Sequence, residues 1–143
     1  MKVTQSVLEE GLSHLGLKSG DSVLVHSLLS SFGFVDGGAI TVIDSFLNVL
    51  KDEGLLIVPT LTGKITDCRD KPPIFDVKTT PCWTGKIPET FRMMKQAVRS
   101  LHPTHSVAAI GDRKYELTRL HETGLSPCDD KSPYGPMSIK STN

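Results

Sequence analysis

The fold is decided by residues 22–59, which read SVLVHSLLSSFGFVDGGAITVIDSFLNVLKDEGLLIVP. Residues 22–26 and 55–59 are short apolar runs rich in β-branched side chains, which predicts two buried strands. Between them, residues 39–51 carry apolar side chains at helical spacing after two glycines. A strand, a helix and a second strand in this order predict a parallel pair joined by a right-handed crossover.

The segments on either side extend this α/β pattern over one domain. Helical spacing predicts a first helix between Thr4 and Gly16, a helix over 88–98 and another over 114–121. Residues 106–110 form a third apolar run and are predicted to be a strand. Two stretches show no periodicity, the long loop of residues 61–85 and the tail of residues 122–143. A loop of this length in a compact domain is usually functional or disordered.

Composition narrows the classes of function. The 143 residues hold 16 Lys plus Arg and 16 Asp plus Glu, so no general basic surface for nucleic acid is expected. The chain has 3 cysteines without metal-type pairing, which fits a reducing compartment. We see no leader sequence and no apolar run long enough to cross a bilayer. These features predict a cytoplasmic protein without membrane or nucleic-acid partners.

Two turns are crowded with polar side chains. The first spans residues 26–31, just after the first apolar run, and is followed by Gly37 and Gly38. The second spans residues 99–106 and reads RSLHPTHS. Hydroxyls at a strand end, with glycines before a helix, suit a ligand rich in phosphate and amide groups, such as coenzyme A.

Six motifs in a fixed order make this chain similar to one known family. They read VHSLLSSFGFVDGGA, IVPT, PxFDxxxTP, GKIPETFR, RSLHPTHSVAAIG and KSPYG. In this order and at this spacing they resemble the aminoglycoside 3-N-acetyltransferases, also called the antibiotic N-acetyltransferase family, from about Leu12 to Gly135. The resemblance implies a three-layer α/β/α fold with a mainly parallel central sheet. It also implies acetyl transfer from acetyl-CoA to an amine of an aminoglycoside-type antibiotic, with no metal.

The resemblance carries roles to particular residues. His102 is the catalytic candidate within this chain. The predicted coenzyme-binding residues, which lie in the two polar turns and at the two glycines, are His26, Ser27, Leu28, Leu29, Ser30, Ser31, Gly37, Gly38, His102 and Ser106. The loop of residues 61–85 is expected to face the amine substrate, with Asp76 attracting its positive charge and Trp83 stacking on it.

The chain also departs from the family pattern. Leu28 stands where a second serine is usual, and Cys82 and Trp83 stand where serine and arginine are usual. Family members are roughly twice as long, and their general-base histidine follows the KSPYG motif, so we expect an incomplete domain that acetylates slowly. The classical acceptor specificity is therefore open.

Other readings remain open at this stage. One is a non-catalytic coenzyme-binding half-protein, completed as a homodimer or by a complementing chain. Another is a hydrolase using Ser27, His102 and Asp76, although no GxSxG elbow is present. A metal at His102 and His105 lacks a third ligand in the sequence. His14 and His121, on predicted helices, are expected to be solvated, and His105 is expected at the surface.

Overall fold

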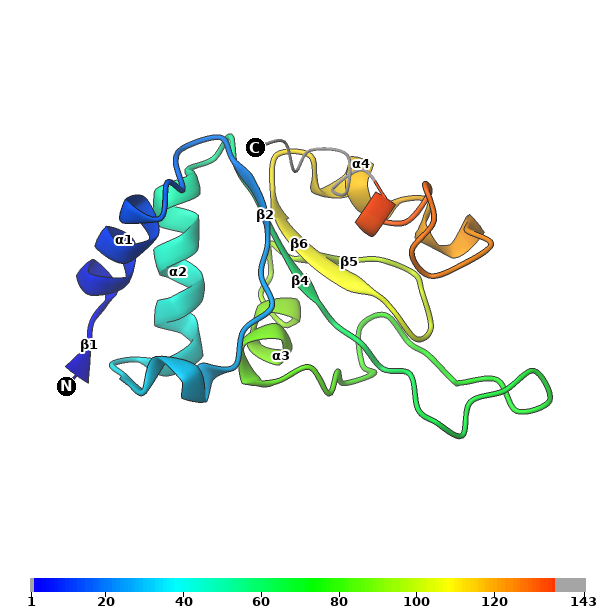
Figure 1. Ribbon diagram of the computed structural model, residues 1–143. Coiled ribbons are helices and arrows are strands. Elements are labelled where there is room, and N and C mark those ends of the chain that lie inside the picture. The colour runs from blue at the N-terminus through cyan, green and yellow to red at the C-terminus, as the bar shows by residue number, and fades with distance from the viewer. Residues whose placement is uncertain (1, 136–143) are drawn as a thin grey trace.

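A computed structural model describes residues 2–135, and it is an α/β protein with a mixed sheet between helices (Figure 1). The strands and helices, in chain order, are β1 (Lys2–Val3), α1 (Gln5–His14), β2 (Ser22–Leu24), β3 (Phe34–Val35), α2 (Gly38–Leu50), β4 (Leu55–Pro59), α3 (Lys86–Arg92), β5 (Val98–Arg99), β6 (Val107–Gly111) and α4 (Lys114–Thr118). Two short 3-10 helices, η1 (Leu29–Phe32) and η2 (His121–Thr123), complete the list.

The main sheet has the strand order β2-β4-β6-β5. Strands β2 and β4 are parallel, with Ser22 opposite Leu55, and α2 connects them, so the predicted crossover unit is confirmed. Strand β6 runs antiparallel to both β4 and β5. The expectation of a mainly parallel sheet is therefore wrong for the described residues. The turn of residues 100–106 reverses the chain, so β5 and β6 form a hairpin instead of a crossover.

The two faces of the sheet bury different sets of side chains. On one face, Leu56 and Val58 of β4 join a core with Ile43 of α2 and Phe91 of α3. On the opposite face, a smaller cluster contains Leu55, Ile57, Val107 and Ala109, and Leu117 of α4 and Tyr134 pack against it. Alternate residues of a strand point to opposite faces, so β4 contributes to both cores and all five of its residues are buried.

Some predicted element boundaries need correction. Helix α3 ends at Arg92 instead of continuing to residue 98, because Val98 and Arg99 pair with β6 as a strand. Helix α4 ends at Thr118 instead of 121. Strand β2 is only half-buried and ends at Leu24, whereas a fully buried strand was expected over 22–26. Tertiary pairing overrides the local helical preference of residues 93–97.

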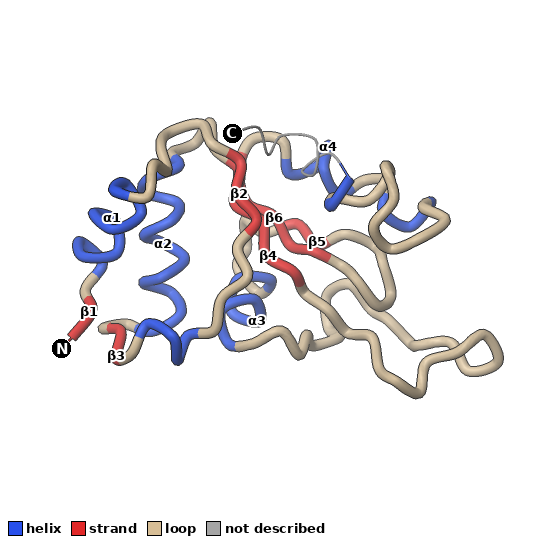
Figure 2. The backbone as a smooth tube through the Cα atoms, viewed as in Figure 1, coloured by secondary structure: helices blue, strands red, loops and turns tan. Residues whose placement is uncertain are grey.

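The loop of residues 61–85 contains no helix or regular strand, as the sequence predicts. It leaves the end of β4, extends away from the sheet and returns to α3 (Figure 2). An isolated bridge between Cys68 and Lys71 marks its tip region. The expected irregular tail is described as far as Gly135; residues 136–143 lie outside the described residues.

Candidate active site

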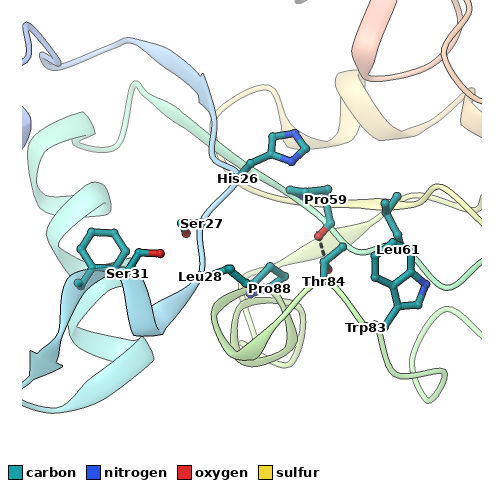
Figure 3. Close-up of a pocket in the computed structure, with 10 residues that line it drawn as sticks. His26, Ser27, Leu28, Ser31, Pro59, Leu61, Trp83, Thr84 and Pro88 are labelled. Atoms are coloured by element: carbon teal, nitrogen blue, oxygen red, sulfur yellow. Dashed lines mark hydrogen bonds between the residues drawn. The ribbon is translucent and has the colours of Figure 1, made fainter.

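A cavity of about 690 Å³ lies where the end of β4 faces the first polar turn and the start of α3 (Figure 3). Its walls are mostly apolar, and the polar groups are spaced along them. The lining residues are His26, Ser27, Leu28, Ser31, Phe32, Pro59, Leu61, Trp83, Thr84 and Pro88. An apolar slot with a few hydroxyls and one imidazole suits an extended ligand that carries amides.

The first polar turn supplies one side of the cavity. His26, Ser27, Leu28 and Ser31 line it, so four of the predicted coenzyme-binding residues come together there. Their backbone is shaped by η1, in which the Ser31 amide donates to the Leu28 carbonyl at 3.0 Å. Leu29 and Ser30 belong to the same short helix but are not among the lining residues.

The two predicted glycines lie at the start of α2, away from the lining. Gly37 caps the helix in the left-handed conformation with a φ of 81°, and Gly38 follows with 65°. A Cβ atom on Gly37 would lie 2.3 Å from the Thr41 Oγ1 atom, so the local fold itself requires glycine there. A role for the two glycines in coenzyme binding stays a prediction.

The far wall of the cavity is built by the end of the long loop. The Thr84 hydroxyl donates to the Pro59 carbonyl at 2.7 Å, which joins this wall to β4. The Trp83 indole N–H donates to the Gly63 carbonyl at 2.9 Å, and its backbone N–H donates to the Leu61 carbonyl at 3.0 Å. The indole is 63% exposed, so its ring is available for stacking on a ligand.

Asp76 does not line this cavity. Its carboxylate accepts hydrogen bonds from the backbone N–H groups of Lys78 at 2.9 Å and Thr79 at 2.7 Å, and from the Thr79 hydroxyl. These bonds, led by the Thr79 backbone, lower the pKa of Asp76. The carboxylate therefore shapes a turn of the exposed loop, and its predicted contact with substrate is untested.

His102 lies in the turn between β5 and β6 and is half-buried. Its Nδ1 atom accepts from the backbone N–H groups of His105 at 3.0 Å and Thr104 at 3.3 Å. Burial, and secondarily His121 and His105, lower the pKa of His102 to about 4. The ring is thus neutral near pH 7, with its proton on Nε2. His102 is not among the cavity-lining residues, and its catalytic role stays a prediction.

The prediction that the His121 imidazole is solvated is wrong. This side chain is fully buried instead. Its ring lies 4.6 Å from that of His102, centroid to centroid. One ring nitrogen bonds the Ser100 hydroxyl at 2.8 Å and the other faces the Pro127 carbonyl at 3.0 Å. The sequence pattern did not indicate this burial, because it predicts a helix through residue 121, whereas α4 ends at Thr118.

Ser106 is not among the cavity-lining residues either. It is fully buried and bonds the Thr60 hydroxyl and carbonyl, each at 2.9 Å. The Nε atom of Arg99 donates to the Ser106 hydroxyl at 3.0 Å. The structure thus uses Ser106 to join β4, β5 and β6. Its coenzyme contact is likewise untested.

The hydrolase and metal-site alternatives find no geometric support in residues 2–135. No hydrogen bond joins Ser27, His102 and Asp76 there, as a hydrolase triad needs. No group of three or more His, Cys, Asp or Glu side chains in the described part of the chain is arranged to hold a metal ion. Among the described helices, none combines the length and the apolar character that a membrane crossing requires.

The chain is thus a mixed-sheet α/β protein with a largely apolar cavity at the end of β4, in which a few polar side chains are spaced along the walls. The family model for aminoglycoside 3-N-acetyltransferase matches residues 24–139. The chain belongs to this family of acyltransferases.

Individual relatives agree. The prophage-derived aminoglycoside N(3')-acetyltransferase-like protein YokD of Bacillus subtilis is 34% identical over 96% of this chain and 57% of its own length. The crystal structure of YokD superposes with a TM-score of 0.85, covering 96% of this chain and 61% of that one. Aminoglycoside N(3)-acetyltransferase IX of Micromonospora chalcea is 34% identical, over 94% of this chain and 50% of its own.

A third relative was solved with a ligand. The structure of AAC-VIa bound to sisomicin is 27% identical with a TM-score of 0.81, over 93% of this chain and 55% of that one. The chain therefore spans about half the length of the curated relatives it matches.

Proposed function

We propose that this chain contributes the coenzyme side of an N-acetyltransferase site, which transfers acetyl from acetyl-CoA to an amine of an aminoglycoside-type compound. The observation that carries the proposal is the cavity itself, in which Ser27, Ser31 and Thr84 are spaced along apolar walls. Pantetheine is a narrow chain with two amides, so it needs such donors and acceptors at intervals. Family membership supplies the reaction class.

The acceptor class rests on the relatives. AAC-VIa binds sisomicin, and an aminoglycoside-type amine is the acceptor we infer for this chain by analogy. Trp83 lines the cavity and presents its ring to a sugar or amine substrate. The Asp76 carboxylate lies on the same loop, outside the lining, and is proposed to attract the cationic substrate toward it.

The chemistry needs a nitrogen nucleophile, a thioester and a base that removes the amine proton. His102 is the catalytic candidate, although its Nδ1 is occupied by backbone donors and its Nε2 carries the proton. We further propose that residues 1–143 alone acetylate slowly, because none of them matches the family's general-base histidine. A missing general base typically lowers a rate by about 10²- to 10⁴-fold.

Location and assembly follow from the same proposal. Acetyl-CoA is an intracellular metabolite, so a cytoplasmic site of action is consistent with the proposed reaction. A homodimer or a complementing chain that completes the site also stays a prediction. Sedimentation across a range of protein concentrations tests it, since self-association makes the apparent mass depend on concentration.

Coenzyme binding is tested by calorimetric titration of the folded chain with coenzyme A. Ser31→Ala removes one lining hydroxyl, and we expect the Kd to rise by about 2- to 10-fold. Ser13→Ala is the matched control, because Ser13 is exposed on α1 and does not line the cavity. Equal effects of both variants, or no binding by wild-type chain that circular dichroism shows to be folded, would contradict the proposal.

A further inference from the structure

Arg99 is a buried arginine that has no role in the reaction proposed above. It lies in β5 and is 8% exposed. Among the described residues, the two ion pairs are Lys2 with Asp36 and Arg92 with Glu89, so no described carboxylate pairs with Arg99. A buried charge is costly unless hydrogen bonds satisfy it, which makes its neutral partners informative.

Apart from the Ser106 hydroxyl next to β6, those partners lie on the two arms of the long loop. From Nη2, Arg99 donates to the Thr60 carbonyl at 3.0 Å, where the chain leaves β4. From Nη1, it donates to the carbonyl of Thr80, where the chain returns, and more weakly to that of Val77 at 3.5 Å. The guanidinium carbon also lies 4.9 Å from the centre of the Phe75 ring.

One side chain therefore links the start and the end of the loop to the sheet. Thr80 precedes the cavity wall formed by Trp83 and Thr84 by only a few residues. Other contacts hold this wall, including the Glu89 carboxylate that accepts from the Cys82 backbone N–H at 2.9 Å. The bonds of Trp83 to the Gly63 and Leu61 carbonyls join the two arms to each other. The planar fork of Arg99 instead ties both arms to β5 (Figure 1 shows the loop's two arms leaving β4 and returning to α3).

We propose that Arg99 is a positioning residue that fixes the Trp83–Thr84 wall of the coenzyme cavity by tying both arms of the loop to β5. The inference that this serves coenzyme binding rests on the proposed function, but the loop geometry does not. Lysine keeps the charge and loses the fork, and methionine keeps the approximate length and loses both. The two variants therefore separate charge from geometry.

The fluorescence of Trp83 reports on the cavity wall directly, because the sequence contains a single tryptophan. Acrylamide quenching of this residue measures how freely the wall opens. Trypsin cleavage after Lys64 and Lys78, both exposed on the loop, measures opening of the two arms. In Arg99→Met we expect cleavage at Lys78 to be about tenfold faster and the Kd for coenzyme A about tenfold higher, with smaller changes in Arg99→Lys.

Val42→Ala is the matched control for a merely structural effect. Val42 is buried in α2 and does not line the cavity, so its truncation lowers stability without touching the loop. At a temperature where all variants are folded, we expect Val42→Ala to leave Trp83 quenching and loop cleavage unchanged. If Arg99→Met does not fold, Arg99→Lys alone decides.

Two results overturn the inference. The first is a folded Arg99 variant with wild-type quenching and wild-type cleavage. The second is equal loop opening in Val42→Ala, which makes the effect one of global stability. Absence of coenzyme binding by the wild-type chain would refute the proposed function instead, and the quenching and cleavage data would still decide the role of Arg99.

Discussion

Replacing His102 by asparagine should remove the part of the chain's acid sensitivity that arises from this ring between about pH 6.5 and pH 4. In the folded protein the Nδ1 atom of His102 accepts two backbone hydrogen bonds, from Thr104 and His105. The asparagine side-chain oxygen can accept in the same place, but the amide does not titrate. The substitution thus preserves the turn and deletes one proton-binding group.

The magnitude follows from the pKa of His102, which is lowered from 6.5 to about 4 in the folded state, chiefly by burial. The unfolded chain therefore binds more protons between these values, and stability is complete above about pH 6.5 and decreases as the pH falls toward 4. The full shift corresponds to about 3 kcal/mol, and solvent access to the half-buried ring reduces this to about 1.5 kcal/mol. For a chain of this size that is about 5 °C in Tm.

The assay is urea unfolding at several pH values between 7 and 4, for wild type and His102→Asn. Other ionisable groups face the ring, namely His105, His121 and Asp129, and they are present in both proteins. The difference between the two curves therefore reports on His102 together with its interactions with these groups. His14→Asn is the control, since His14 is exposed on α1. Identical pH dependence in wild type and His102→Asn would show that His102 is not held neutral, and the reasoning would be wrong.

Two further substitutions test the fold. Gly37→Ala should lower the free energy of unfolding by about 1–2 kcal/mol or more, because the residue has a φ of 81° and its new Cβ would meet Thr41. Urea unfolding measures this loss. Gly20→Ala is the control, since Gly20 has a similar φ but lies in open space, so the comparison separates the clash from the backbone strain. Phe91→Ala should cost about 3–5 kcal/mol, since the ring is fully buried between α3 and the sheet, whereas Met93→Ala, at an exposed site, should be nearly neutral in the same thermal-unfolding measurement.

The crossover unit was predictable because its signal is local. Residues 55–59 are apolar without interruption and residues 39–50 keep a helical stripe, so β4 and α2 follow directly from the pattern. Strand β5 was not, because Val98 ends an apparent helix and Arg99 begins an apparent turn, and the two become a strand only by pairing with β6. Such pairing is a tertiary effect that a short window of sequence does not contain.

The site divides in the same way. The first polar turn was predictable as a cluster, and four of its residues do line the cavity. Thr84, Pro59 and Pro88 were missed, because the return of a long irregular loop places Thr84 and the start of α3 against the end of β4. The available signal was that Pro59 belongs to IVPT, Pro88 belongs to GKIPETFR and Thr84 directly precedes GKIPETFR, since a strand end and a helix start often border a ligand.

The second polar turn, residues 99–106, helps to identify the family, but its side chains have structural contacts that the motif alone does not reveal. Each of its polar side chains has a bond in the fold: Arg99 holds the long loop, Ser100 bonds His121, His102 accepts from its own turn, and Ser106 joins β4. Three of these contacts reach segments far along the chain, namely the loop before α3, the segment after α4 and Thr60 at the end of β4. In the first turn, four residues instead line the cavity, namely His26, Ser27, Leu28 and Ser31. Hence changes in the second turn should act on binding mainly through the position of the cavity walls, and those in the first turn through direct contact.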